Sequence, residues 1–178
     1  MTKPPDAIRV LIVDDSAVIR GALGRIVDAE PDMHVLTTAP NGRVALDALK
    51  HTAVDVVLLD IEMPEMDGLT ALPLILSTYP ATRVIMASSL TQRGAEVTMQ
   101  ALSMGAADFI AKPAAKSGSA TLAAISVEIA SKVRAVGRSA RGRTDVRPTV
   151  PRPPMPVRTE LHSPPCSARC PSPFRYRS

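Results

Sequence analysis

The sequence contains no tryptophan, few other aromatic residues and only two cysteines among its 178 residues. Because aromatic residues make up 2% of the chain and apolar residues 46%, a hydrophobic core must be built from aliphatic side chains. A C-x-x-x-C pair by itself is a poor zinc site, so we interpret Cys166 and Cys170 as incidental free thiols.

Long apolar runs are also missing from the sequence. No stretch approaches the roughly 20 apolar residues that a membrane-spanning helix needs. The N-terminal segment "MTKPPDAIRV" lacks the apolar centre of a signal peptide. We therefore expect no membrane insertion and a cytoplasmic location.

Charge is distributed unevenly along the chain, although the formal net charge is only +4. Residues 1–135 have three more acidic than basic residues, whereas residues 136–178 carry nine arginines, two acidic residues and no lysine. The second segment also contains 9 of the 17 prolines. Such a composition cannot bury enough apolar surface to offset its ordering entropy. We predict one globular domain over residues 7–135 and a disordered Pro/Arg-rich linker or tail over residues 136–178.

Short apolar runs rich in β-branched residues alternate with segments of helical periodicity. Runs of this kind are typical of strands that are covered on both faces, and the alternation predicts an α/β fold with a doubly wound, five-stranded parallel sheet. Pro73 lies inside one helical segment, which predicts that this helix either starts later or is kinked. The expected strands are 8–13, 33–38, 54–59, 83–87 and 107–110, and the expected helices are 16–29, 42–51, 68–78, 94–104 and 119–135.

Chemically active side chains follow four of the five expected strands. Asp14 and Asp15 follow the first, Asp60 the third, Ser88 the fourth and Lys112 the fifth. In parallel α/β sheets the carboxyl ends of the strands form the ligand-binding edge. Crowded carboxylates need a cation, and Mg²⁺ prefers such oxygen ligands. Asp60 could then act as a nucleophile that forms an acyl phosphate, with Mg²⁺, Lys112 and Ser88 neutralising the phosphoryl oxygens.

Each of these residues also has a simpler interpretation. Asp15 and Ser16 could form only a helix N-cap. Asp60 alone could be a turn residue, and Lys112 before a proline could mark another turn. The joint occurrence of the residues at successive strand ends favours the phosphoryl-transfer site over these alternatives.

Four motifs in this sequence resemble the receiver domain of two-component response regulators. They are "LIVDDS", "LLDIEMPEMDGL", "IMASS" and "FIAKP", and the resemblance covers about residues 8–130. It implies a flavodoxin-like (βα)5 fold with strand order 2-1-3-4-5, which is the order known for this class of doubly wound sheet. It further implies phosphoryl transfer from a histidine kinase.

The resemblance also implies a role for each matching residue. Asp60 corresponds to the phosphoacceptor, and Asp14 and Asp15 to the acidic pair, of which Asp15 would bind Mg²⁺ directly. The main-chain carbonyl of Glu62 corresponds to a further metal ligand beside Asp60. Ser88 corresponds to the switch hydroxyl.

Three more positions match the same family. Lys112 corresponds to its invariant lysine, and the bond from Lys112 to Pro113 is expected to be cis. Phe109 corresponds to the aromatic switch residue. Gly68 corresponds to the glycine of the loop after the phosphoacceptor.

A longer stretch, "SSLTQRGAEVTMQALSMGAADFIAKP", is similar to the receiver of the chemotaxis protein-glutamate methylesterase. This similarity implies a chemotaxis-type histidine kinase as partner and chemoreceptors as a second candidate. In that family a hydrolase domain follows and acts on receptor glutamyl and glutaminyl side chains. No G-x-S-x-G motif occurs in this sequence, and its histidines are only His34, His51 and His162. We therefore assign no hydrolase site to this chain.

Two other hypotheses concern the C-terminal segment. Its arginines could contact nucleic acid, but no helix-turn-helix or other reading module is visible, so we predict no nucleic-acid partner. From about residue 157 the sequence no longer resembles the family. We interpret this end as the product of a shifted reading frame or a truncated gene.

Overall fold

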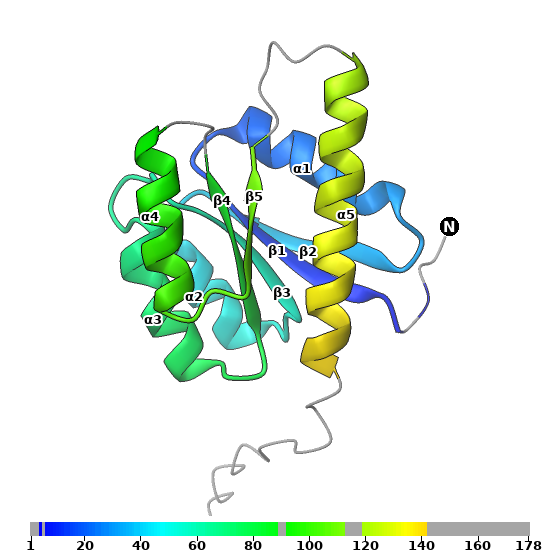
Figure 1. The fold of residues 1–178 in the computed structure, drawn as a ribbon. Coiled ribbons are helices and arrows are strands. Elements are labelled where there is room, and N and C mark those ends of the chain that lie inside the picture. Colours follow the sequence, from blue (N-terminus) through cyan, green and yellow to red (C-terminus); the bar gives the residue numbers. More distant parts are fainter. Residues whose placement is uncertain (1–3, 5, 89–91, 113–118, 142–178) are drawn as a thin grey trace, which may run out of the picture. The chain divides into compact units, whose positions relative to one another are not determined.

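Five strands and five helices alternate along the part of the chain that the computed structural model describes, which is residues 4, 6–88, 92–112 and 119–141 (Figure 1). The chain divides into two units, Met1–Arg147 and Pro148–Ser178, and the second lies wholly outside the described residues. The strands are β1 (Ile8–Val13), β2 (Met33–Ala39), β3 (Val56–Asp60), β4 (Arg83–Ser88) and β5 (Asp108–Ala111). The helices are α1 (Ala17–Ala29), α2 (Gly42–His51), α3 (Gly68–Thr78), α4 (Gln92–Ser103) and α5 (Ser119–Arg141).

The strands form one parallel sheet in the order β2-β1-β3-β4-β5. This confirms the predicted (βα)5 flavodoxin-like architecture. The register aligns the carboxyl ends of the central strands, because Val13 pairs with Leu59 and Asp60 pairs with Ala87. Ser88 pairs with Ala111 at the end of β5. The residues that follow these strands therefore emerge along one edge of the sheet.

Helices cover both faces of the sheet, with α1 and α5 on one face and α2, α3 and α4 on the other (Figure 1). Successive strand residues point to opposite faces, so strands β1 to β4 contribute to both hydrophobic clusters, whereas β5 contributes Ile110 to one of them. The side chains are aliphatic or methionine, as the scarcity of aromatic residues required. One cluster contains Leu11, Val57, Leu59, Ala71, Leu72, Ile75 and Met86, and the other contains Val10, Ile12, Leu23, Leu58, Ile85, Ile129 and Val133.

Helix α3 begins at Gly68 with Asp67 as its N-cap, and Pro73 lies inside it. The expectation of a later helix start is therefore wrong. Pro73 has no N–H to donate to the carbonyl of Leu69, but its side chain is exposed and the neighbouring Leu72 and Ile75 are fully buried. Burial of these apolar side chains offsets the missing hydrogen bond.

Helix α5 is longer than the sequence pattern indicated, because it continues through Arg141 instead of ending at residue 135. Residues 136–141, which the composition placed in a disordered tail, are helical. Arg141 donates to Oδ2 of Asp55 at 3.0 Å and also to the carbonyl oxygens of Asp6 and Ala7. A Cβ atom on Gly137 would lie 2.6 Å from the side chain of Ile8, so glycine allows the helix to approach β1 closely. These contacts with Asp55 and with the start of the chain stabilise the last turns.

No helix among the described residues is both long and apolar enough to cross a membrane. The expected cis bond between Lys112 and Pro113 lies outside the described residues, as do Cys166, Cys170 and the remainder of the predicted tail from residue 142 onward.

Candidate functional site

The two acidic residues after β1 differ in environment. Asp14 is fully buried, and its Oδ1 accepts from the N–H of Ser16 at 2.8 Å. Asp15 is exposed. Ser16 caps helix α1 by accepting from the N–H of Ile19. The N-cap interpretation therefore holds for Ser16, and both acidic residues remain available for another role.

Arg20, one turn into α1, fixes the backbone of this acidic turn. Its guanidinium donates to the carbonyl oxygen of Asp14 at 2.6 Å and to that of Asp15 at 3.1 Å. This residue was not predicted from the sequence. Only its position in the first turns of the helix that follows the acidic pair could have indicated this role from the sequence.

Asp60 lies at the end of β3 and is only 2% exposed. Its Oδ1 accepts from the N–H of Glu62 at 3.4 Å. The ammonium of Lys112 lies 2.6 Å from Oδ2 of Asp60 and 2.8 Å from Oδ2 of Asp14. Among the described residues neither Oδ2 atom has another polar partner. The structure thus brings together three of the predicted site residues, which are separated by at least 46 positions along the chain.

Burial and the ion pairing between Lys112 and the two aspartates have opposite effects on the pKa values in this cluster. Burial raises the pKa of Asp60 above its usual range, and the negative charge of Asp14 adds to this effect, while Lys112 opposes it. Burial alone would lower the pKa of Lys112, but its hydrogen bonds and ion pairs with Asp14 and Asp60 outweigh burial and raise it. The lysine therefore remains a cation between two buried carboxyl groups.

The three carboxylates form a donor set that fits a hard divalent cation. Asp14, Asp15 and Asp60 can each offer one oxygen, and these oxygens all lie within 4.8 Å of one another. Two of the residues are buried and the third is exposed, so the cluster is enclosed on one side and accessible to solvent on the other. Oxygen ligands at this spacing suit Mg²⁺, which retains several water ligands in proteins.

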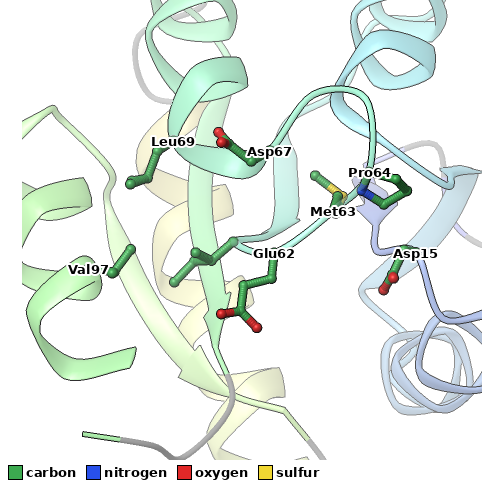
Figure 2. A pocket seen from close by; sticks show the side chains of 8 residues that line it. Asp15, Glu62, Met63, Pro64, Asp67, Leu69 and Val97 are labelled. Carbon is green, nitrogen blue, oxygen red and sulfur yellow. The ribbon is translucent and has the colours of Figure 1, made fainter. Parts of the chain in front are cut away.

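A cavity of about 430 Å³ lies beside this cluster (Figure 2). Figure 2 shows Asp15 on one side of the loop after β3, and Leu69 and Val97 on the other. The lining combines exposed acidic side chains with apolar ones, and consists of Asp15, Ile61, Glu62, Met63, Pro64, Asp67, Leu69 and Val97. Asp15 is the member of the carboxylate cluster that lines this cavity.

Gly68 brings the start of α3 against the end of β3. A Cβ atom at this position would lie 2.0 Å from the carbonyl oxygen of Asp60. The N–H of Gly68 instead donates to the carbonyl of Ile61 at 2.9 Å. The glycine after the expected phosphoacceptor is therefore explained by close backbone approach.

The two expected switch residues lie on neighbouring strands, Ser88 on β4 and Phe109 on β5. Ser88 ends β4, and its carbonyl oxygen accepts from the N–H of Lys112 at 2.9 Å, which ties the lysine's backbone to β4. Phe109 lies on β5 and is 42% exposed. The ammonium of Lys132 lies 4.5 Å from the centroid of its ring. Lys132 was not identified from the sequence, since a lysine 23 positions away gives no local signal.

Comparisons with known proteins agree with this geometry. Residues 10–123 match the response regulator receiver domain family. The chain is 45% identical over 153 residues to a protein-glutamate methylesterase/protein-glutamine glutaminase of Azospirillum brasilense, and the match covers 83% of this chain but only 39% of that protein.

Two solved structures have the same fold. The response regulator domain of Thermotoga maritima CheB is 44% identical, with a TM-score of 0.66, and the match covers 74% of this chain and 97% of that one. A CheX-CheY-BeF3-Mg+2 complex from Borrelia burgdorferi gives 30% identity and a TM-score of 0.60, and the match covers 76% of this chain and 98% of that one.

Proposed function

We propose a function from one established premise, namely that the chain belongs to the response regulator receiver domain family. In this proposal Asp60 accepts a phosphoryl group from a histidine kinase, and the chain acts as a phosphorylation-controlled switch. The observation that carries the proposal is the contact of one ammonium, that of Lys112, with both Asp14 and Asp60 in a cluster of three carboxylates.

In the proposed reaction a carboxylate oxygen of Asp60 forms a bond to phosphorus while the bond between phosphorus and the donor's leaving group breaks. Asp14, Asp15, Asp60 and the main-chain carbonyl of Glu62 would hold Mg²⁺, which supplies charge neutralisation on the phosphoryl oxygens when bound. The N–H of Glu62 lies 3.4 Å from Oδ1 of Asp60 and helps to orient the attacking carboxylate.

Lys112 can stay bound in the site while negative charge develops on the phosphoryl group attached to Asp60. In the unphosphorylated chain its ammonium contacts both Asp14 and Asp60. Asp14 can retain the lysine when Asp60 becomes an acyl phosphate, so the ammonium moves to a phosphoryl oxygen without leaving the site. The new charge also attracts the hydroxyl of Ser88, and the ring of Phe109 then turns inward.

The test is phosphorylation by acetyl phosphate in the presence of Mg²⁺, read as a mass gain of one phosphoryl group. Wild type should be labelled, and both Asp60→Asn and addition of a chelator should abolish the label. Asp47→Asn is the matched control, because Asp47 is an exposed aspartate on α2 that pairs with Lys50 on the same helix. Equal labelling of Asp60→Asn and wild type would refute the assignment of the phosphoacceptor.

The partner and the output are proposed from the relatives. This chain spans about two fifths of the length of the methylesterase/glutaminase relatives that it matches. We propose a chemotaxis-type histidine kinase as the phosphodonor, a cytoplasmic location, and control of receptor demethylation or deamidation as the output. Transfer of labelled phosphate from such a kinase to wild type, but not to Asp60→Asn, tests the partner. Hydrolysis of methylated chemoreceptor by the 178-residue chain would reveal esterase activity that its motifs do not indicate.

A further inference from the structure

The exposed ring of Phe109 is contacted by a cation on the neighbouring helix. Strand β5 alternates between buried and accessible side chains, so Ile110 is fully buried whereas Phe109 points outward. The ammonium of Lys132 on α5 lies 4.5 Å from the ring centroid, which is within the range of a cation–π interaction.

Lys132 is fixed in this place by three further groups that do not depend on the ring. Its ammonium donates to the carbonyl oxygen of Phe109 at 2.6 Å and to Oδ1 of Asp108 at 3.2 Å. It also forms an ion pair with Glu128 at 3.2 Å, one turn earlier on α5. The same oxygen of Asp108 accepts from the N–H of Phe109 at 2.7 Å, so the carboxylate is held as well. Rotation of the ring would therefore break only one of these four contacts of the ammonium.

We propose that Lys132 is a positioning residue that holds the ring of Phe109 in its outward orientation and so lowers the fraction of unphosphorylated chains with the ring turned inward. This inference rests on the switch motion in the proposed function. A contact that exists in only one of two conformations shifts the equilibrium by its own free energy and no more. For an exposed cation–π pair this corresponds to a change of about two- to five-fold in the ratio of the two orientations.

A competing explanation gives Lys132 only a structural role, as an ion pair that fastens α5 to β5. That explanation depends on Asp108 and Glu128, and it predicts no effect on the orientation of the ring as long as the helix stays in place. The two explanations differ for Lys132→Gln, which retains only a hydrogen-bond donor, because only the positioning role predicts a change in ring orientation. Lys132→Arg, which retains both the charge and the ring contact, tests whether the effect of Lys132→Gln comes from the lost cation. The two explanations differ again for Glu128→Gln, which removes an ion pair but leaves the ring contact.

The experiment is ¹⁹F NMR of the full chain labelled with 4-fluorophenylalanine. The sequence has only two phenylalanines, Phe109 and Phe174, and the variant Phe174→Leu assigns the two signals. The difference in chemical shift between H₂O and D₂O reports the exposure of each ring. Without a phosphodonor, Lys132→Gln should increase the ratio of inward to outward ring about two- to five-fold. Lys132→Arg should restore the wild-type value.

Two variants serve as controls in the same measurement. Glu128→Gln should leave the Phe109 signal at its wild-type position. Lys50→Gln removes a lysine that pairs with an exposed carboxylate on its own helix, and it should also leave the signal unchanged. If Lys132→Gln matches wild type, or if Glu128→Gln has the same effect as Lys132→Gln, the proposal is overturned. Circular dichroism of each variant shows whether α5 is intact, and Lys132→Met provides a second uncharged variant if Lys132→Gln is unfolded.

Addition of acetyl phosphate and Mg²⁺ separates this inference from the proposed function. If the wild-type Phe109 signal moves inward on phosphorylation and Lys132→Gln reaches that position at a lower phosphodonor concentration, both stand. If wild type does not respond while Lys132→Gln still shifts without a donor, the positioning role stands and the proposed switch fails.

Discussion

Replacement of Gly68 by alanine should destabilise the domain and displace its phosphoacceptor. The added Cβ would lie 2.0 Å from the carbonyl oxygen of Asp60, 2.9 Å from its carbonyl carbon and 3.1 Å from Cα of Ile61. All three neighbours are backbone atoms, so no flexible side chain can move away. Either the first turn of α3 or the end of β3 must shift by about 1 Å to restore normal contact distances.

The free-energy cost follows from two contributions. Overpacking at a site that cannot relax costs about 1–3 kcal/mol. The shift also stretches the hydrogen bond from the N–H of Gly68 to the carbonyl of Ile61, which is 2.9 Å long and contributes about 1 kcal/mol. We expect a loss of about 3 kcal/mol in the free energy of unfolding, a large part of the stability of an ordinary domain.

Urea unfolding followed by circular dichroism measures this loss, and labelling by acetyl phosphate measures the displacement of Asp60. Gly21→Ala is the matched control, since Gly21 lies inside α1 with nothing within 4 Å of a Cβ atom. That variant should gain about 1 kcal/mol from its higher helix propensity and should be labelled at the wild-type rate. If Gly68→Ala were as stable as wild type and labelled equally fast, the packing argument for this glycine would be wrong.

Two further predictions concern stability. Asp55→Asn should cost about 2 kcal/mol at pH 7, because the buried Asp55 loses its ion pairs with Arg9 and Arg141, whose side chains are partly exposed. Burial alone would raise the pKa of Asp55, but the hydrogen bonds from the two arginines outweigh burial and lower the pKa. The stabilisation by Asp55 is therefore present above the unfolded-state pKa and is lost as the pH falls through the folded-state pKa. Urea unfolding from pH 7 to about pH 3 should therefore show the gap between wild type and variant narrowing, and a constant gap would contradict the assigned role. Pro73→Ala should stabilise the domain by about 2 kcal/mol, because alanine restores a hydrogen bond to the carbonyl of Leu69. An unchanged urea midpoint would show that the helix already compensates for the missing hydrogen bond.

Helix α5 illustrates the limit of prediction from local pattern. Gly137 and the arginines that follow it have the composition of a linker, and this composition predicts that the domain ends at residue 135. In the structure Arg141 bonds to Asp55, which is 86 positions away, and Gly137 lies against Ile8. A helix end that is stabilised by such distant contacts leaves no periodic signal in its own sequence.

The sequence by itself determined the alternation of strands and helices and the positions of the polar residues after the strands. Asp14, Asp60, Ser88 and Lys112 could be expected at one edge of the sheet, because a parallel sheet brings the carboxyl ends of its strands together whatever the details of packing. The tertiary structure alone decided which atoms meet there. It placed the ammonium of Lys112 between two buried carboxylates and that of Lys132 beside the Phe109 ring. The physical reason is that residue periodicity reflects local backbone geometry, whereas ion pairs and ring contacts depend on how helices and strands far apart in the chain pack together.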